Sequence, residues 1–199
     1  IRVSCLEHHS LLHLFIMSEI EIKIERYISL LKSYNEHTNI YSKSAYDKLP
    51  FHIEDSKTIA SLIGDSSLTV ADLGSGSGLP AVIIAICNPN NHVIGIESKS
   101  RKRRFLHNVV ETLGLKNLEI YEGDIQEFTR LRKDRVDVLT AKALAKPDKI
   151  CAYAKRFNFT SLKVIVPVGQ NYVNESSDTI GKFVISENNY LYYICSFSS

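Results

Sequence analysis

Three acidic residues in the middle of the chain each follow an apolar run, and the first of them opens a glycine-rich segment. Residues 70–80 read Val-Ala-Asp-Leu-Gly-Ser-Gly-Ser-Gly-Leu-Pro, so Asp72 is followed by three glycines at alternate positions. A glycine turn lets backbone N–H groups approach a ligand because no Cβ stands in the way. In parallel α/β sheets, nucleotides bind at the carboxyl ends of strands. The segment therefore predicts a site for a nucleotide-type cofactor.

The spacing of the glycines indicates which cofactor. Dinucleotide-binding folds use Gly-x-Gly-x-x-Gly, and phosphate-binding loops use Gly-x-x-x-x-Gly-Lys-Ser/Thr, whereas this segment reads Asp-x-Gly-x-Gly-x-Gly. A carboxylate at Asp72 would repel a pyrophosphate but attract an ammonium or sulfonium group. S-adenosylmethionine carries both of these cations and no phosphate, so we expect it to be the cofactor.

Two further carboxylates stand at the ends of the next two apolar runs. Glu97 closes the run 92–97, where a carboxylate can accept hydrogen bonds from both ribose hydroxyls. Asp124 follows the run 118–123, and we expect it to lie with Ile125 at the adenine end of the cofactor. The cofactor-binding residues that we predict are Asp72, Gly74, Ser75, Gly76, Gly78, Leu79, Glu97, Asp124 and Ile125.

The elements that must position these residues follow from the apolar periodicity. The expected strands are 68–73, 93–97, 118–122, 136–141 and 163–168, and the helices expected after them are 79–88, 99–113, 124–131 and 147–157. Such alternation is typical of a parallel sheet covered on both faces. Two last runs, 182–186 and 190–197, predict an antiparallel hairpin at the sheet edge. The fold class is therefore a Rossmann-like α/β fold with a central, mostly parallel sheet.

Two helices are expected before the first strand. Apolar residues recur at helical spacing over 19–34. A second helix is expected to begin at the capping residues Asp55 and Ser56 and to end at Ile63. In this interpretation His52 is a structural residue of the capping turn.

The composition is that of one globular domain. The chain has 199 residues, of which 44% are hydrophobic and 23% charged, and this suits a single core. Met17 is the only methionine, so we expect residues 1–16 to be an upstream extension and residues 17–199 to form one domain. Four widely spaced cysteines without companion histidines favour reduced thiols and no metal site. No segment reaches membrane-spanning length, and we expect a cytoplasmic monomer.

The net charge of +2 is too small to indicate a nucleic-acid ligand by itself, but the positive charge is locally clustered. Residues 99–104 contain five basic residues and no acidic one. The residues that we predict to contact RNA are Arg101, Arg103 and Arg104. The same run could also be the solvated face of an ordinary helix.

Four segments carry a resemblance to a known family. They are Tyr34-Asn35 with Asn39-Ile40-Tyr41, His52 with Asp55-Ser56, the segment 72–80 running on to Ala85 and Pro89, and Glu97-Ser98-Lys99 with Lys102, Phe105 and Leu106. Over residues 19–170 the chain resembles the small-subunit ribosomal RNA guanine-N7 methyltransferases, also called glucose-inhibited division protein B. The resemblance implies a class I methyltransferase domain. Its implied reaction is methyl transfer from S-adenosylmethionine to N7 of a guanine in 16S RNA of the 30S subunit.

The chain departs from the family pattern at three places. Gly78-Leu79-Pro80-Ala81 stands where the family has Gly-Phe-Pro-Gly, and Val168-Gly169 stands for its Lys-Gly. Ala141-Lys142-Ala143 stands for its Ser/Thr-Arg-Ala, and lysine lacks the planar bidentate contact of arginine. We expect Lys142 to position the substrate. The departures fit a diverged enzyme with the same target or one with weaker activity.

No catalytic base is expected, because guanine N7 carries an unprotonated lone pair at neutral pH. Two other functions fit the same pattern. One is methylation of a small molecule or a protein, with residues 19–64 as a cap over the pocket. The other is a cofactor-binding assembly module that does not catalyse.

Overall fold

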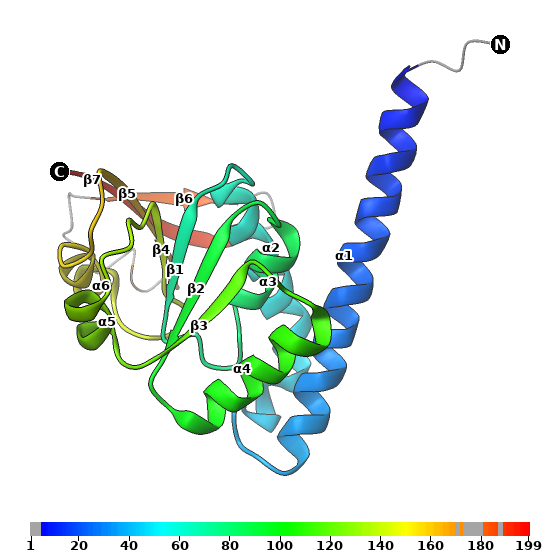
Figure 1. Ribbon diagram of the computed structural model, residues 1–199, viewed down its shortest axis with the longest axis horizontal. Coiled ribbons are helices and arrows are strands. Elements are labelled where there is room, and N and C mark those ends of the chain that lie inside the picture. Colours follow the sequence, from blue (N-terminus) through cyan, green and yellow to red (C-terminus); the bar gives the residue numbers. More distant parts are fainter. Residues whose placement is uncertain (1–4, 170–171, 173–180, 187–188) are drawn as a thin grey trace.

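The computed structural model describes residues 5–169, 172, 181–186 and 189–199, and side chains from residue 19 onward. Seven strands of this described part form one sheet in the order β3-β2-β1-β4-β5-β7-β6 (Figure 1). The parallel strands are β1 (Thr69–Leu73), β2 (His92–Glu97), β3 (Leu118–Glu122), β4 (Val138–Thr140) and β5 (Ser161–Pro167). The hairpin of β6 (Lys182–Ile185) and β7 (Leu191–Ser198) is antiparallel, with β6 at the edge. The predicted fold class is confirmed.

Helices cover both faces of the sheet. One face carries α1 (Cys5–Glu36), α2 (Leu49–Ile63), α3 (Ala81–Cys87) and α4 (Ser100–Leu113). The other face carries α5 (Ile125–Leu131) and α6 (Pro147–Ala154). Alternate residues of each strand join opposite cores; Val70 of β1 packs with the first group and Ala71 with the second. This double cover explains why the strands read as continuous apolar runs.

The strand order creates a crevice at the end of β1. From β1 the chain moves outward through β2 and β3 and then returns to β4 on the other side of β1. Asp72, near the end of β1, pairs with Gly95 of β2 and with Thr140 of β4. In open α/β sheets, ligands bind at such a reversal of strand order, outside the carboxyl ends of the strands. The glycine-rich segment lies at this point.

Both helices before the sheet differ from the expectation. The helix expected over 19–34 is the C-terminal part of the longer α1, whose N-terminal part extends away from the sheet (Figure 1). The second helix does not begin at Asp55 and Ser56. It begins at Leu49, where Pro50 occupies the first turn and its fixed φ favours a helix start. Asp55 and Ser56 are buried in mid-helix, so the predicted cap was wrong.

Candidate active site

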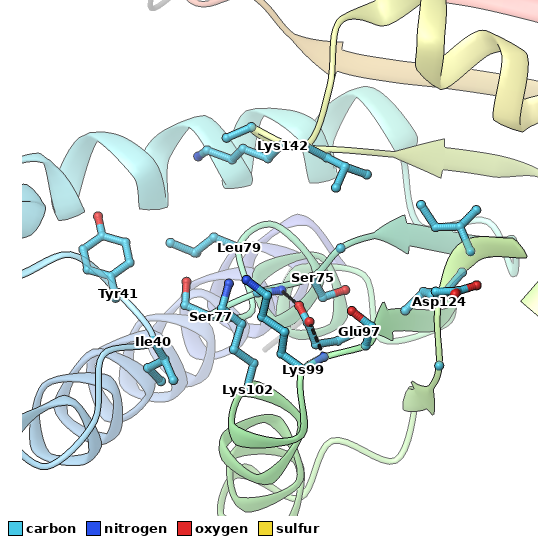
Figure 2. Close-up of a pocket in the computed structure, with 18 of the residues that line it drawn as sticks. Ile40, Tyr41, Ser75, Ser77, Leu79, Glu97, Lys99, Lys102, Asp124 and Lys142 are labelled. Atoms are coloured by element: carbon cyan, nitrogen blue, oxygen red, sulfur yellow. Dashed lines mark hydrogen bonds between the residues drawn. The ribbon is translucent and has the colours of Figure 1, made fainter. Parts of the chain in front are cut away.

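A cavity of about 590 Å³ opens at the carboxyl ends of β1, β2, β3 and β4 (Figure 2). Its volume lies in the range of small-molecule sites. It is lined by four loops that follow strands, by one loop before α2 and by α2 itself. The lining residues are Ile40, Tyr41, His52, Gly74, Ser75, Gly76, Ser77, Leu79, Ile96, Glu97, Ser98, Lys99, Lys102, Gly123, Asp124, Ile125, Lys142, Ala143 and Leu144. Seven of the nine predicted cofactor residues are among them, and Asp72 and Gly78 are not.

The glycine loop is fixed against β2 through its backbone. The N–H groups of Gly74 and Ser75 both donate to the carbonyl of Ile96, at 2.9 and 3.1 Å. Gly74 and Gly76 have φ values of 69° and 62°, a region that side chains disfavour. A Cβ at Gly78 would lie 2.6 Å from Cγ2 of Val82, so this glycine packs the loop against α3. Gly78 shapes the loop from behind the cavity.

Glu97 connects the end of β2 to the glycine loop. Its side chain is buried, and its Oε2 accepts a hydrogen bond from Gly76 N–H at 2.9 Å. Its Oε1 accepts from Lys99 N–H at 2.8 Å (Figure 2). A carboxylate offers about four lone-pair sites, so these two bonds leave room for two more donors. The two hydroxyls of a ribose are donors of the required kind.

Asp72 lies behind the glycine loop. It is 1% exposed, and its Oδ1 accepts a hydrogen bond from the Thr140 hydroxyl at 2.8 Å. Burial raises the pKa of Asp72 to about 6. The carboxylate therefore joins β1 to β4, and Asp72 is not among the residues that line the cavity.

Asp124 is the N-cap of α5. Its Oδ1 accepts a hydrogen bond from Glu127 N–H at 2.8 Å. Asp124 is exposed and Ile125 half-buried, and both line the cavity on the β3 side. Figure 2 shows Asp124 on the side of the cavity away from Tyr41.

The wall across the cavity from Glu97 contains a buried ion pair between the loop that follows β4 and helix α2 (Figure 2). Nζ of Lys142 lies 2.5 Å from Oδ2 of Asp55 and donates to the carbonyl of His52 at 3.2 Å. Oδ1 of Asp55 accepts from the Tyr192 hydroxyl at 2.6 Å. Burial lowers the pKa of Lys142, and the charge of Asp55 opposes this shift. The ammonium is thereby held at the cavity wall.

His52 also faces this cavity. Its Nδ1 is buried and has no hydrogen-bond partner in the described part of the chain. Burial, with the nearby Lys142 charge second, lowers the pKa of the His52 ring. His52 therefore lies at a cavity wall in α2, not in a capping turn.

Sequence reasoning did not assign Asp55 and Tyr192 to the site. One signal was available, because Asp55 falls within a helix whose neighbouring turns are apolar, at Ile53 and Ile59. A carboxylate buried in such a helix requires a partner. The sequence does not say that the partners come from β4 and β7.

The predicted RNA residues occupy the start of α4, outside the cofactor cavity. The Arg103 side chain is bound within the protein. Its Nε lies 3.1 Å from Oε2 of Glu122, and its guanidinium donates a hydrogen bond to the Ser98 carbonyl. Arg101 and Arg104 are exposed. Arg101 lines a second groove beside the cavity.

Both a family model and curated relatives match most of the chain. A family model described as "GidB: rRNA small subunit methyltransferase G" matches residues 20–191. The chain is 35% identical over 159 residues to a ribosomal RNA small subunit methyltransferase G of Orientia tsutsugamushi, covering 79% of this chain and 77% of that protein.

Solved structures share the fold at low sequence identity. A SAM-dependent methyltransferase from Aquifex aeolicus has a TM-score of 0.57 at 19% identity, over 78% of this chain and 98% of that chain. A mutant of MtNAS in complex with S-adenosylmethionine has a TM-score of 0.57 at 18% identity, over 92% of this chain and 77% of that chain. Among the described residues, no helix is long and apolar enough to cross a bilayer.

Proposed function

The chain belongs to the GidB family, rRNA small subunit methyltransferase G, and on that premise we propose that it transfers a methyl group from S-adenosylmethionine to N7 of a guanine in 16S ribosomal RNA. The main support for the proposal is the position of Glu97. This residue is buried at the edge of a 590 Å³ cavity, and its carboxylate can accept hydrogen bonds beyond the two from Gly76 and Lys99. The guanine-N7 specificity comes from the family. The glycine loop reads Asp-x-Gly-x-Gly-x-Gly without a phosphate-binding motif, which favours this cofactor over a phosphate-bearing nucleotide.

The residues of the cavity fit this cofactor. Gly74 and Gly76 leave backbone free of Cβ atoms on one side, and Glu97 presents a carboxylate to the ribose. Asp124 and Ile125 form the adenine end in this proposal. When bound, S-adenosylmethionine supplies an electrophilic methyl group on a sulfonium. The residues that line the cavity would hold the cofactor in place while the guanine approaches, and orientation of two reactants can contribute about 7–11 kcal/mol.

Lys142 is the residue that we propose positions the guanine. Asp55 and the His52 carbonyl fix its ammonium at the cavity wall opposite Glu97. The ammonium is a point donor, so it suits the O6 acceptor of guanine. No proton leaves N7 during methyl transfer, and none of these residues acts as a base.

The partner in this proposal is the 16S RNA of the 30S subunit, bound by a cytoplasmic monomer. The RNA approaches along the basic start of α4, with Arg101, Arg103 and Arg104 on that side of the molecule. The methyltransferase domain comprises residues 17–199. In this proposal residues 1–16 lie outside it, in keeping with the N-terminal part of α1, which extends away from the sheet (Figure 1).

The experiment is methyl transfer with purified components. The chain is incubated with labelled S-adenosylmethionine and 30S subunits, and the RNA is digested and analysed for 7-methylguanosine by mass spectrometry. The proposal expects label in this nucleoside and its loss in Glu97→Ala. Label in ribosomal protein or in another nucleoside would overturn it.

A further inference from the structure

A second groove adjoins the cofactor cavity. It has a volume of about 690 Å³ and lies between the loop that follows α1 and the start of α4. Its lining residues are Asn39, Ile40, Tyr41, Ser42, Lys99, Ser100, Arg101 and Lys102. Four of them, Ile40, Tyr41, Lys99 and Lys102, line the cofactor cavity as well. The two hollows therefore share a wall, and a chain leaving one passes directly into the other.

The groove is positively charged and carries no acidic lining residue. Lys99, Arg101 and Lys102 form no ion pair with any residue that the structure describes. Arg103 on the same helix turn is different, because Glu122 neutralises it. Cations gathered in a hollow without counter-charges focus the field on an anionic ligand.

The wall opposite these cations is held in place by Asn35. This side chain is fully buried, and its Nδ2 donates to the Tyr41 carbonyl at 2.7 Å and to the Tyr46 hydroxyl at 2.8 Å. Its Oδ1 accepts from the N–H groups of Ile40 and Tyr41 at 3.0 and 3.2 Å. The rings of Tyr41 and Tyr46 stack with their centroids 5.9 Å apart. The groove is therefore preformed between two anchored segments.

We propose that this groove binds a backbone phosphate of the substrate RNA, next to the nucleotide whose guanine enters the cavity. The inference rests on the proposed function and assigns its phosphate site. Lys99 and Lys102 line both the cavity and the groove, so in this assignment they face the phosphodiester nearest the target base. Arg101 extends the charge away from the cavity. Arg103 is structural in this assignment, and Arg104 adds only long-range attraction.

The test compares two exposed arginines of equal charge, of which one lines the groove and the other does not. Arg101→Gln and Arg104→Gln remove one positive charge each from exposed positions of α4, and only Arg101 lines the groove. Binding of a single-stranded RNA oligonucleotide is measured across a salt series. A phosphate contact contributes about 0.7 to the slope of log affinity against log salt. We expect Arg101→Gln to lower the slope by about this amount and Arg104→Gln by less than half of it.

A second variant changes the other wall. Asn39→Asp is nearly isosteric and places a carboxylate in the groove across from the cations. It is expected to weaken RNA binding, with cofactor affinity unchanged, because Asn39 does not line the cofactor cavity. Equal slopes for the two arginine variants, or undiminished RNA binding by Asn39→Asp, would overturn the assignment.

The experiments distinguish a wrong assignment of the groove from a wrong proposed function. If the wild type makes 7-methylguanosine but Arg101→Gln keeps the wild-type slope, the groove assignment is wrong and the methyltransferase proposal stands. If the wild type transfers no methyl group but the slopes differ as expected, RNA binding in the groove stands and the catalytic proposal is wrong.

Discussion

The two walls of the cofactor cavity are built in different ways. The wall at β1 and β2 is held by backbone groups: N–H groups of Gly74, Ser75 and Gly76 bind Ile96 and Glu97. The wall at β4 and α2 is held by side chains, through the ion pair of Lys142 with Asp55. A backbone wall depends on glycines and on one strand register. A side-chain wall depends on charges brought together by the tertiary fold.

The backbone wall faces the cofactor in our proposal, and the side-chain wall faces the substrate. In the hydrogen bonds from Gly74 and Ser75 to the Ile96 carbonyl, donor and acceptor are both backbone groups, and neither of them titrates. A buried ion pair is costly to break, because the remaining partner is left charged or must change its protonation. We therefore propose that substrate specificity resides in the wall of Lys142 and Asp55, where a single substitution leaves a buried charge unpaired.

The largest effect is expected from Asp55→Asn. The change leaves the Lys142 ammonium buried without a counter-charge, and breaking such pairs typically costs about 3–5 kcal/mol of unfolding free energy. The double variant with Lys142→Met should recover much of the loss, because the unpaired charge is then gone. Denaturant unfolding of the wild type, both single variants and the double variant measures the coupling. Additive single effects would show that the pair does not hold this wall.

A smaller effect is expected from the pH dependence of Asp72, which joins the two walls. Its folded pKa of about 6 lies above the reference value of 3.8. The folded state therefore binds the proton more tightly. This contribution to stability is complete below about pH 3.8 and is lost as pH rises through 6.

The measurement compares Asp72→Asn with the wild type between pH 4 and pH 7. Two pKa units correspond to about 3 kcal/mol, so the unfolding free energy of the wild type should fall by up to this amount relative to the variant. Parallel pH curves for the two proteins would contradict the burial of an ionisable Asp72.

Cofactor affinity is expected to respond to the backbone wall. Hydrogen bonds to a charged acceptor contribute about 1.5–3 kcal/mol, so Glu97→Ala should weaken S-adenosylmethionine binding by about tenfold to a hundredfold. Glu122→Gln is the matched control, since it removes a carboxylate at the end of the next strand, outside the cavity. Calorimetry gives both dissociation constants. Unchanged affinity in Glu97→Ala would remove this residue from the cofactor site.

The smallest effect is expected at the N-terminus. A chain that starts at Met17 shortens α1, but it removes only the N-terminal part of this helix, which extends away from the sheet (Figure 1). Its melting temperature and cofactor affinity should equal those of the full chain. A clear drop in either would show that residues 1–16 pack on the domain.

The same comparison explains what the sequence could predict. Glu97 and the glycine loop were found because a strand, its last residue and its turn are adjacent in the chain. The mostly parallel sheet and its antiparallel edge hairpin followed from the local alternation of strands and helices, whereas the order of the strands came only from the structure. The start of α2 was missed because Asp55 and Ser56 resemble a cap in sequence, whereas Pro50 begins the helix. The ion pair with Lys142 was missed because only the folded sheet and α2 together bring the two residues into contact.

The most direct test of the central claim is the nucleoside content of 16S RNA in cells. RNA from cells with the gene, without it, and with the Glu97→Ala form is digested and analysed for 7-methylguanosine by mass spectrometry. We expect the nucleoside to be lost without the gene, restored by the wild type, and restored poorly or not at all by Glu97→Ala. A level of 7-methylguanosine in 16S RNA that is the same with and without the gene would contradict it.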